Sequence, residues 1–261
     1  MSGQHWLSQK YFNQRVTLGS TRSQLGLKMT VQINVAKGNY KGATFITGFH
    51  GIGETGYIAT SFLVHALRAE RIGFIEVSHP PPFVNSTHEA LVTPFEIYKK
   101  GKLIIAKLEF SPHKSEESEF LKALSSWVTK ERLKEAIMIG GLDTSFRRGN
   151  SPLRVVHTRA YPVRSKTFGS LRLEEELFVY GPLAVMLSEF EIRDFPALAI
   201  LPYASSSRPD PAAAAVAIRI ICKIHNLKVN VSDLERDAKD IETEIEQKMK
   251  QTHKSLQGMF V

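Results

Sequence analysis

The sequence has a single cysteine, Cys222, among its 261 residues. One cysteine excludes an intrachain disulfide framework and fits a reducing compartment. Long hydrophobic runs are also missing, because the longest, residues 212–218, falls far short of the roughly 18 residues that a membrane helix needs. Residues 1–15 contain no apolar segment of the kind found in secretory signals. We therefore expect a cytoplasmic protein with no membrane segment.

Motifs that mark several enzyme classes are missing as well. The sequence contains no GxxxxGK[ST] phosphate loop, no GxSxG nucleophile, no HExxH zinc site and no CxxC pair. Its nine histidines do not cluster, and the spacing of His79 and His88 does not suit a metal site. Cys222 lies in an apolar helical segment and is predicted to be a buried, inert thiol. These absences predict neither a metal nor a cofactor.

Acidic residues are missing from residues 144–173, within a chain whose formal net charge is +8. Besides Lys166 and Arg172, this segment contains five residues that we group as a candidate basic surface: Arg147, Arg148, Arg154, Arg159 and Arg164. Such a surface would attract an acidic protein or a phosphate backbone. A solvated, loop-rich face is the simpler interpretation, and no nucleic-acid-binding motif supports the alternative. We do not expect nucleic acid as the main partner.

Hydrophobic periodicity predicts strands that alternate with helices. Strands are predicted at residues 30–36, 43–47, 72–77, 95–98, 103–110, 136–139 and 197–201, and helices at 57–69, 115–130, 182–190 and 212–225. This alternation favours an α/β domain with a mainly parallel sheet and a ligand crevice beyond the carboxyl ends of the strands. Residues 144–180 should contain at least one further element.

We expect four segments along the chain. They are an N-terminal arm (1–28), an α/β domain (29–230), a C-terminal amphipathic helix (231–257) and a tail (258–261). The apolar positions of the amphipathic helix form a short heptad seam: Leu234, Ala238, Ile241 and Ile245. This seam is too short for an independent coiled coil. The helix packs either on a partner helix, within the chain or across an oligomer, or as an amphipathic helix on its own domain, and the sequence leaves these alternatives open.

The clearest motif is a glycine-rich loop between a predicted strand and a predicted helix. It runs from Gly48 to Gly56, and Gly51, Gly53 and Gly56 satisfy the dinucleotide-binding fingerprint. Glu76 follows 20 residues after Gly56, where a ribose-binding acid is expected. On this interpretation the glycines would allow a pyrophosphate to approach the N-terminus of the helix.

A purely structural turn is the interpretation we favour for this loop. Glu54 points at the start of the helix, where its carboxylate would serve the free N–H groups and repel phosphate. His50 could act as a general base only with a partner such as Glu54, Glu76 or Asp143. Because no nucleophile–base pair can be identified, we interpret His50 as a turn residue with local hydrogen bonds. A nucleoside- or nucleotide-binding enzyme is the alternative.

The sequence ends in Gly258-Met259-Phe260-Val261 after a polar helical segment. Two large apolar side chains and a carboxylate on a flexible end could dock in a pocket of a partner, with a lysine pairing the carboxylate. A frayed end without function is the interpretation that composition alone favours.

Three stretches resemble the proteasome-assembly chaperone family, in the form found as stand-alone archaeal proteins. Residues 47–59 are similar to the family's "GFpGiGxxGxxA" opening. Gly181-Pro182-Leu183 and the predicted strand at 197–202 form the second stretch. Residues 208–214 match a "PDPxAA" helix start, and a charged helix at 233–248 follows.

The resemblance implies a three-layer α/β/α sandwich that resembles nucleoside phosphorylases, with a C-terminal helical extension and no recognised catalysis. It implies a non-enzymatic chaperone or adaptor, often a homo-oligomer, that contacts the proteasome core particle or other assembly clients. Related members carry a C-terminal hydrophobic–tyrosine–any-residue tail that inserts between α-subunits of the core particle. Met259-Phe260-Val261 looks like that tail with phenylalanine in place of tyrosine, and loss of the hydroxyl hydrogen bond would cost about 1 kcal/mol.

Overall fold

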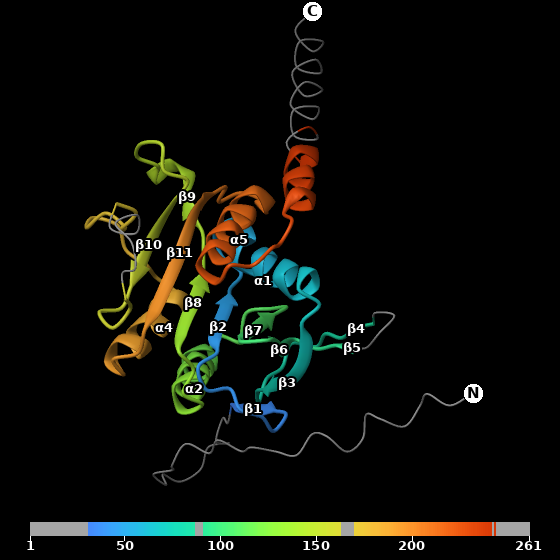
Figure 1. Ribbon diagram of the computed structural model, residues 1–261. Helices are drawn as coiled ribbons and strands as arrows, with labels where there is room; N and C mark the ends of the chain where they lie inside the picture. The colour runs from blue at the N-terminus through green and yellow to red at the C-terminus, as the bar shows by residue number, and fades with distance from the viewer. Residues whose placement is uncertain (1–30, 87–90, 163–169, 242, 244–261) are drawn as a thin grey trace, which may run out of the picture.

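The computed structural model describes residues 31–86, 91–162, 170–241 and 243 (Figure 1). The N-terminal arm, Arg164, Lys166 and the tail, Met259 to Val261, lie outside these residues. Within them, nine strands form one sheet: β1 (Gln32–Val35), β2 (Thr44–Gly48), β3 (Glu70–Glu76), β6 (Phe95–Lys100), β7 (Leu103–Leu108), β8 (Glu135–Ile139), β9 (Leu142–Asp143), β10 (Leu153–His157) and β11 (Ala197–Ala204). A separate hairpin pairs β4 (Asn85–Ser86) with β5 (Leu91–Val92).

The helices follow the predicted positions closely. They are α1 (Thr55–Ala66), α2 (Glu117–Lys130), α4 (Pro182–Ile192) and α5 (Pro211–His225), with short 3-10 helices η1 (Ile52–Glu54) and η2 (Thr144–Phe146). Proline at the first turn of α4 and α5 suits a helix start, because its missing N–H would have no partner there. Asp210 caps α5 by accepting a hydrogen bond from the amide of Ala213, at 3.0 Å. The element predicted to lie within 144–180 is β10.

The prediction of a mainly parallel sheet is wrong, because the sheet is mixed. Its strand order is β1-β3-β6-β7-β2-β8-β11-β10, with β9 beside β11. Only the centre, β7-β2-β8-β11 with β9, is parallel, whereas β1, β3, β6 and β10 add antiparallel pairs at both sides. Hydrophobic patterns locate strands but do not give their direction, and the β6–β7 hairpin reverses the chain where a helical crossover would have kept it parallel.

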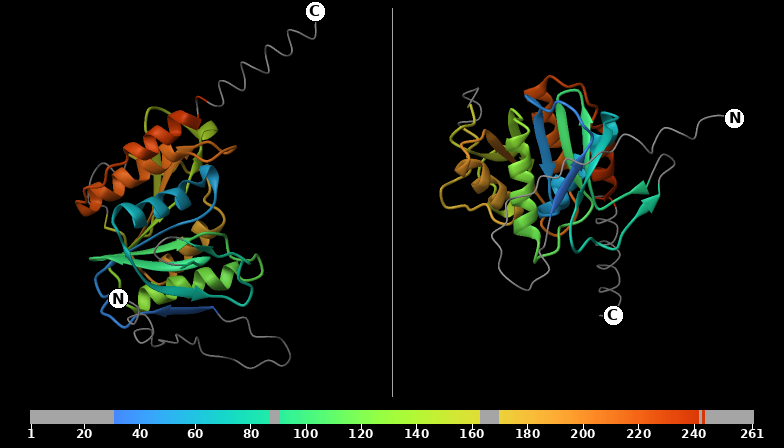
Figure 2. Two further views of the ribbon diagram at one scale, coloured as in Figure 1. Left: turned by 90° about the vertical axis from the view of Figure 1, so that its right-hand side faces the viewer. Right: turned by 90° about the horizontal axis from the view of Figure 1, so that it is seen from below.

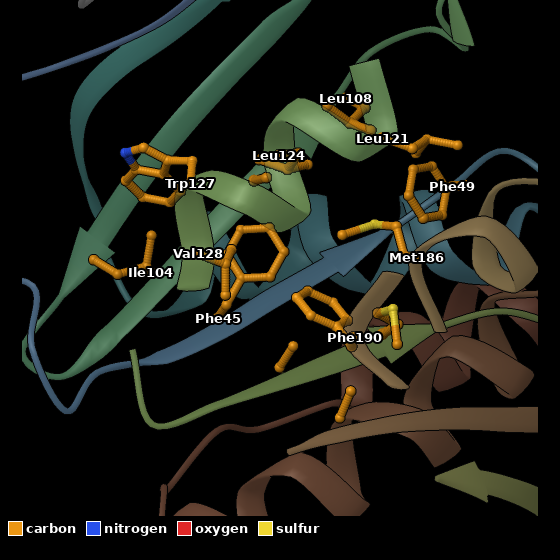
Figure 3. Packing of buried hydrophobic residues seen from close by; sticks show 14 of the residues in the cluster. Phe45, Phe49, Ile104, Leu108, Leu121, Leu124, Trp127, Val128, Met186 and Phe190 are labelled. Carbon is orange, nitrogen blue, oxygen red and sulfur yellow. The ribbon is translucent and has the colours of Figure 1, made fainter. Parts of the chain in front are cut away.

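Helices cover both faces of the sheet and give three layers, as the two views in Figure 2 show. The β2 side chains alternate, so that Phe45 packs with α2 and α4 while Ile46 packs with α1 and α5. The parallel centre is buried on both faces, which is why its strands read as continuous apolar runs. Figure 3 shows the α2/α4 side, where Trp127, Phe45 and Phe190 are among the largest fully buried side chains.

One edge of the sheet is covered by the chain itself. The outer side of β10 pairs with a short extended segment, because the amide of Val155 donates to Leu171 at 2.7 Å and the amide of Leu173 donates to Val155 at 3.0 Å. Unpaired edge strands invite pairing with other chains, and this segment shields part of β10 from such contacts.

The start of the predicted amphipathic helix packs on its own domain. Residues 232–241 are helical, and Val231 and Leu234 join the apolar cluster of α1 and α5. Ala238 is also buried, whereas Ile241 is only partly covered. The intrachain alternative is thus confirmed for the first half of the seam. Ile245 lies outside the described residues, and a partner contact for the second half stays a prediction.

Substitution of Trp127 tests the α2/α4 core. Trp127 is 1% exposed and packs against Tyr40 and Phe45. We expect Trp127→Ala to lower the free energy of unfolding by about 3–5 kcal/mol, because it leaves a large cavity. Phe178 is 82% exposed, so Phe178→Ala should change stability by less than about 0.5 kcal/mol. Equal effects of the two substitutions in urea denaturation would contradict the packing described.

Candidate functional site

The glycine loop lies in direct backbone contact with the ends of the central strands. A Cβ atom on Gly56 would lie 2.5 Å from the carbonyl oxygen of Ile139, and one on Gly48 would lie 2.3 Å from the carbonyl oxygen of Gly56. No side chain fits at such distances. These two glycines therefore bring α1 against β2 and β8, which is a structural task that requires no ligand.

The third close approach joins the loop to the start of α5. Gly53 has a φ of 63°, and a Cβ there would lie 2.8 Å from the Cβ of Ala204. Its carbonyl accepts a hydrogen bond from the backbone amide of Asp210, at 2.8 Å. The Asp210 carboxylate also accepts from the amide of Ser205 at 3.0 Å, in addition to capping α5. The glycine loop and the "PDPxAA" segment are therefore two halves of one contact.

Glu54 does not have the capping role expected for it. It occupies the N-cap position of α1 with a φ of 48°, and its side chain makes no capping hydrogen bond. The expectation was wrong because the left-handed backbone at Glu54 departs from the extended conformation that N-cap residues usually adopt. Gly51 differs from the other loop glycines, since a Cβ there would have no atom within 4 Å.

His50 is held by the end of β7 and by Tyr57, so its hydrogen bond is not a local one as expected. Its Nε2 lies 3.2 Å from the carbonyl oxygen of Leu108, and its ring stacks on Tyr57 with centroids 4.3 Å apart. Burial, followed by the hydrogen bond that the Tyr57 hydroxyl donates to Glu109 at 2.8 Å, raises the pKa of Tyr57 to about 12. Among the described residues, His50 has no bond to a nucleophile or to a carboxylate.

Glu76 cannot serve a ligand bound at the glycine loop. It ends β3, and its carboxylate accepts a hydrogen bond from the side-chain amide of Asn34 at 2.7 Å. Strands β6 and β7 lie between β3 and β2, so three strand spacings, about 14 Å, separate Glu76 from the loop. The expected gathering of Glu76 with the loop is therefore wrong, because the β6–β7 hairpin is inserted where a dinucleotide fold would place the next parallel strand.

Asp143 lies at the expected edge of the sheet, but it acts there as a cap. Its carboxylate accepts from the amide of Ser145 at 2.8 Å at the start of η2. Hydrogen bonds from Ser206 and Ser145 hold the pKa of Asp143 below its usual value. No group of three metal-binding side chains occurs in the part of the chain that the structure describes.

An apolar cavity of about 420 Å³ lies beyond the carboxyl ends of the central strands, where the sequence placed a crevice. Its walls include Phe49, Gly51, Leu142, Leu183 and Leu201. Three strongly exposed aromatic residues border it, namely Phe146 (49%), Phe178 (82%) and Tyr180 (77%). We call these three residues the aromatic rim.

The sequence analysis missed the aromatic rim. A signal was present in residues 177–180, Leu-Phe-Val-Tyr, where Leu177 and Val179 turn inward while Phe178 and Tyr180 face solvent. Successive side chains of an extended segment point to opposite faces. Large apolar residues normally occur on both faces only where both faces are buried. Exposed aromatic residues beside a cavity indicate an interaction surface.

The candidate basic surface is only partly correct. Arg147, Arg148 and Arg159 are exposed. Arg154 is buried and pairs with Glu174 at 2.6 Å, so including it in a surface was wrong. The sequence could not reveal this, because Glu174 lies just outside the acid-free segment and folds back onto β10.

Alanine substitutions in the loop separate its glycines by role. Gly56→Ala should lower the free energy of unfolding by about 1–3 kcal/mol, since the new methyl group meets backbone atoms that cannot move aside. Gly51→Ala faces open space, and we expect a change below about 0.5 kcal/mol. Thermal and urea unfolding would check both. If Gly51→Ala destabilised the chain as much as Gly56→Ala, the loop would be packed differently from this description.

The Arg154–Glu174 pair should contribute to stability in a pH-dependent way. The Arg154 hydrogen bond keeps the pKa of Glu174 below its ordinary value, although burial opposes this shift. The contribution of the pair to stability is fully present above the ordinary pKa of a glutamate. It is lost as the pH falls through the lowered pKa of Glu174. Arg154→Met should cost about 2–3 kcal/mol at pH 7 and clearly less at pH 3.

Arg159→Met is the matched control for that experiment, because the Arg159 side chain is exposed. It should change the unfolding free energy by less than about 0.5 kcal/mol at both pH values. If Arg154→Met lowered the free energy of unfolding by the same amount at pH 3 as at pH 7, the carboxylate of Glu174 would be ruled out as the cause.

Fold and loop together define an α/β/α sandwich in which a glycine loop is closed against strand ends and a neighbouring helix start. A fold of this kind does not by itself define a function. A sequence profile of the PAC2 family matches residues 45–249, and the chain belongs to this family.

Solved structures with the same fold include proteins of archaea and of bacteria. Pyrococcus furiosus PbaA, described as an archaeal homolog of proteasome-assembly chaperone, superimposes with a TM-score of 0.73 at 23% identity, over 87% of this chain and 95% of that one. Pyrococcus furiosus PbaB, described as an archaeal proteasome activator, gives a TM-score of 0.67 at 20% identity, over 85% and 98%. An uncharacterized protein of Methanocaldococcus jannaschii is 24% identical over 220 residues, covering 78% of this chain and 82% of the relative.

Proposed function

We propose that this protein is a non-enzymatic chaperone or adaptor of the proteasome system that acts in the cytoplasm. The observation that carries the proposal is the PAC2 family match over residues 45–249. The fold shared with PbaA and PbaB, whose descriptions name proteasome assembly and proteasome activation, supports it. No helix among the described residues is long and apolar enough to span a membrane.

The glycine loop supports a scaffold better than an enzyme. Gly48 and Gly56 are in close backbone contacts, and His50 is bonded to a carbonyl of β7. The cavity beside the loop is apolar, whereas a nucleotide would need donors for its phosphates. These observations favour the adaptor over the nucleoside- or nucleotide-binding enzyme. The likeness of the sandwich to nucleoside phosphorylases stays a prediction.

The proposed partner is the proteasome core particle, with its α-subunits as the surface that is contacted. The proposed contact is the segment Met259-Phe260-Val261, whose apolar side chains would fill a pocket between subunits. A homo-oligomer would present several such segments together and multiply a weak single contact. Assembly, activation and tethering are all compatible with this mode of binding.

Removal of the Phe260 ring tests the contact. Phe260→Ala should weaken binding to the core particle from the same organism at least about tenfold, because one buried aromatic ring contributes on the order of 2 kcal/mol. Biolayer interferometry with immobilised core particle gives the affinity, and native mass spectrometry gives the stoichiometry. Phe260→Tyr is the conservative partner variant, and we expect it to bind as well as the natural chain or better.

A chain without residues 259–261 provides the control. If it binds as tightly as the natural chain, the interface lies on the folded domain and the tail has no part in it. If neither form binds, the core particle is not the partner.

A further inference from the structure

The cavity of about 420 Å³ beside the glycine loop has an interior that suits an apolar molecule. It lies where the chain leaves β2 and β8, since Phe49 and Gly140 directly follow these strands. Sheets with parallel central strands bind their ligands beyond the carboxyl ends of those strands. Of the side chains that line the cavity in the described part of the chain, only His50, Glu176 and Tyr180 are polar. The volume falls within the roughly 300–1,000 Å³ of ligand pockets.

The polar side chains do not make the interior of the cavity polar. The Nε2 atom of His50 is engaged with the carbonyl oxygen of Leu108, at 3.2 Å. Glu176 and Tyr180 are strongly exposed, so they stand at the mouth. At about 30 Å³ per molecule, the space corresponds to roughly fourteen waters, which would find few hydrogen-bond partners on these walls. An apolar ligand that displaced this water would be stabilised by the hydrophobic effect.

Gly51 leaves room beside the cavity. Its φ of −159° is extended backbone that any residue could adopt, and a Cβ there would meet no atom within 4 Å. The lining glycine Gly141 differs, because a Cβ there would lie 2.2 Å from the carbonyl oxygen of Ile52. Neither backbone conformation nor crowding therefore requires glycine at position 51. A side chain at this position would occupy open space at the cavity wall, so we explain Gly51 by access to the cavity.

Positive charge prevails at the mouth. Arg147 follows the rim residue Phe146, and its guanidinium lies 5.8 Å from the centre of the Tyr203 ring, with no ion pair to any residue that the structure describes. Arg148 lies 3.9 Å from Glu176, but both side chains are about 70% exposed, so this pair contributes little. Two guanidinium groups here stand against a single carboxylate. An anionic group at the mouth would be attracted.

We propose that the cavity binds a small amphiphilic carboxylate. The alkyl chain lies in the interior, and the carboxylate stays at the mouth beside Arg147 and Arg148. The apolar lining selects the chain, the arginines select the head group, and Gly51 leaves the entrance open. This site goes beyond the proposed function, because a chaperone or adaptor needs no small ligand. Binding is measured without the proteasome, so either idea can fail alone.

A homologous series of ligands tests the cavity. Isothermal titration calorimetry on the full-length protein uses sodium hexanoate, octanoate, decanoate, dodecanoate and tetradecanoate below their micelle concentrations. Each added methylene should tighten binding about fourfold as long as the chain fits, because each buried methylene adds a similar free energy. The gain should stop once the cavity is full. Binding that strengthened through the whole series would indicate adsorption on the exposed rim and would contradict a closed site.

A change of head group tests the two arginines. Decanoate should bind the natural chain roughly three- to tenfold more tightly than decanol, the range expected for partly exposed ion pairs. The double variant Arg147→Gln with Arg148→Gln should remove this preference and leave the affinity for decanol unchanged. Arg159→Gln is the matched control, because the exposed Arg159 does not line this cavity. It should keep the preference for decanoate.

A cavity-filling pair gives an independent readout. Gly51→Leu should weaken binding of decanoate and of decanol at least about tenfold, because the new side chain competes with the ligand for the open space. Gly38→Leu, on the exposed turn before β2, is the matched control and should leave both affinities unchanged. Urea denaturation of the two variants shows whether the fold is intact. If Gly51→Leu does not fold, the chain-length series and the arginine variant still decide.

Three results would overturn the proposal. None of the carboxylates could bind the natural chain at millimolar concentration. A carboxylate could bind equally well to the natural chain and to a folded Gly51→Leu variant, which would place the ligand elsewhere. Decanoate could bind no more tightly than decanol, which would mean that the arginines do not select the head group.

Discussion

The contact between the backbone of the glycine loop and the start of α5 is the constraint on which the packing of α1 and α5 against the sheet depends. The Gly53 carbonyl accepts from Asp210, while Asp210 caps α5 and also holds Ser205. Because Gly48 and Gly56 press α1 onto the strand ends, this single region fixes both helices of one layer relative to the sheet. The two sequence motifs that lie more than 150 residues apart are therefore one physical unit. The close approach of their backbones, rather than a ligand, explains which residues occupy these positions.

Most of the fold could be predicted from the sequence, because strands that are buried on both faces and helices with an apolar stripe leave a strong pattern. The helices α2 and α5 and the central strands lie close to their predicted positions. Strand direction and order could not be predicted, since they depend on which connection crosses the sheet. This gap led to the mistaken position of Glu76, whose spacing from Gly56 suited a ribose contact only if its strand were the neighbour of β2.

The site was harder to predict than the fold, for a different reason. Sequence motifs draw attention to glycine, histidine and acidic residues, and here Gly48, Gly56 and His50 are engaged with the backbone. The surface that is free to interact consists of Phe146, Phe178 and Tyr180, which come from two loops and converge only in three dimensions. Arg154 illustrates the same limit, because its burial depends on Glu174 folding back across β10. Local composition carries no information on such long-range pairing.

The segment that shields the edge of β10 continues directly into the one that carries Phe178 and Tyr180. Leu171 and Leu173 bond to Val155, and the backbone reaches α4 within ten residues of Leu173. We therefore expect the shielded edge of β10 and the rim to open together in hydrogen exchange, because they lie on one continuous segment. A partner seated on the rim would slow exchange at Val155, although it need not touch the strand, and an emptied rim would leave the sheet more prone to pairing with other chains. Resistance to aggregation would then depend on whether a partner occupies the rim.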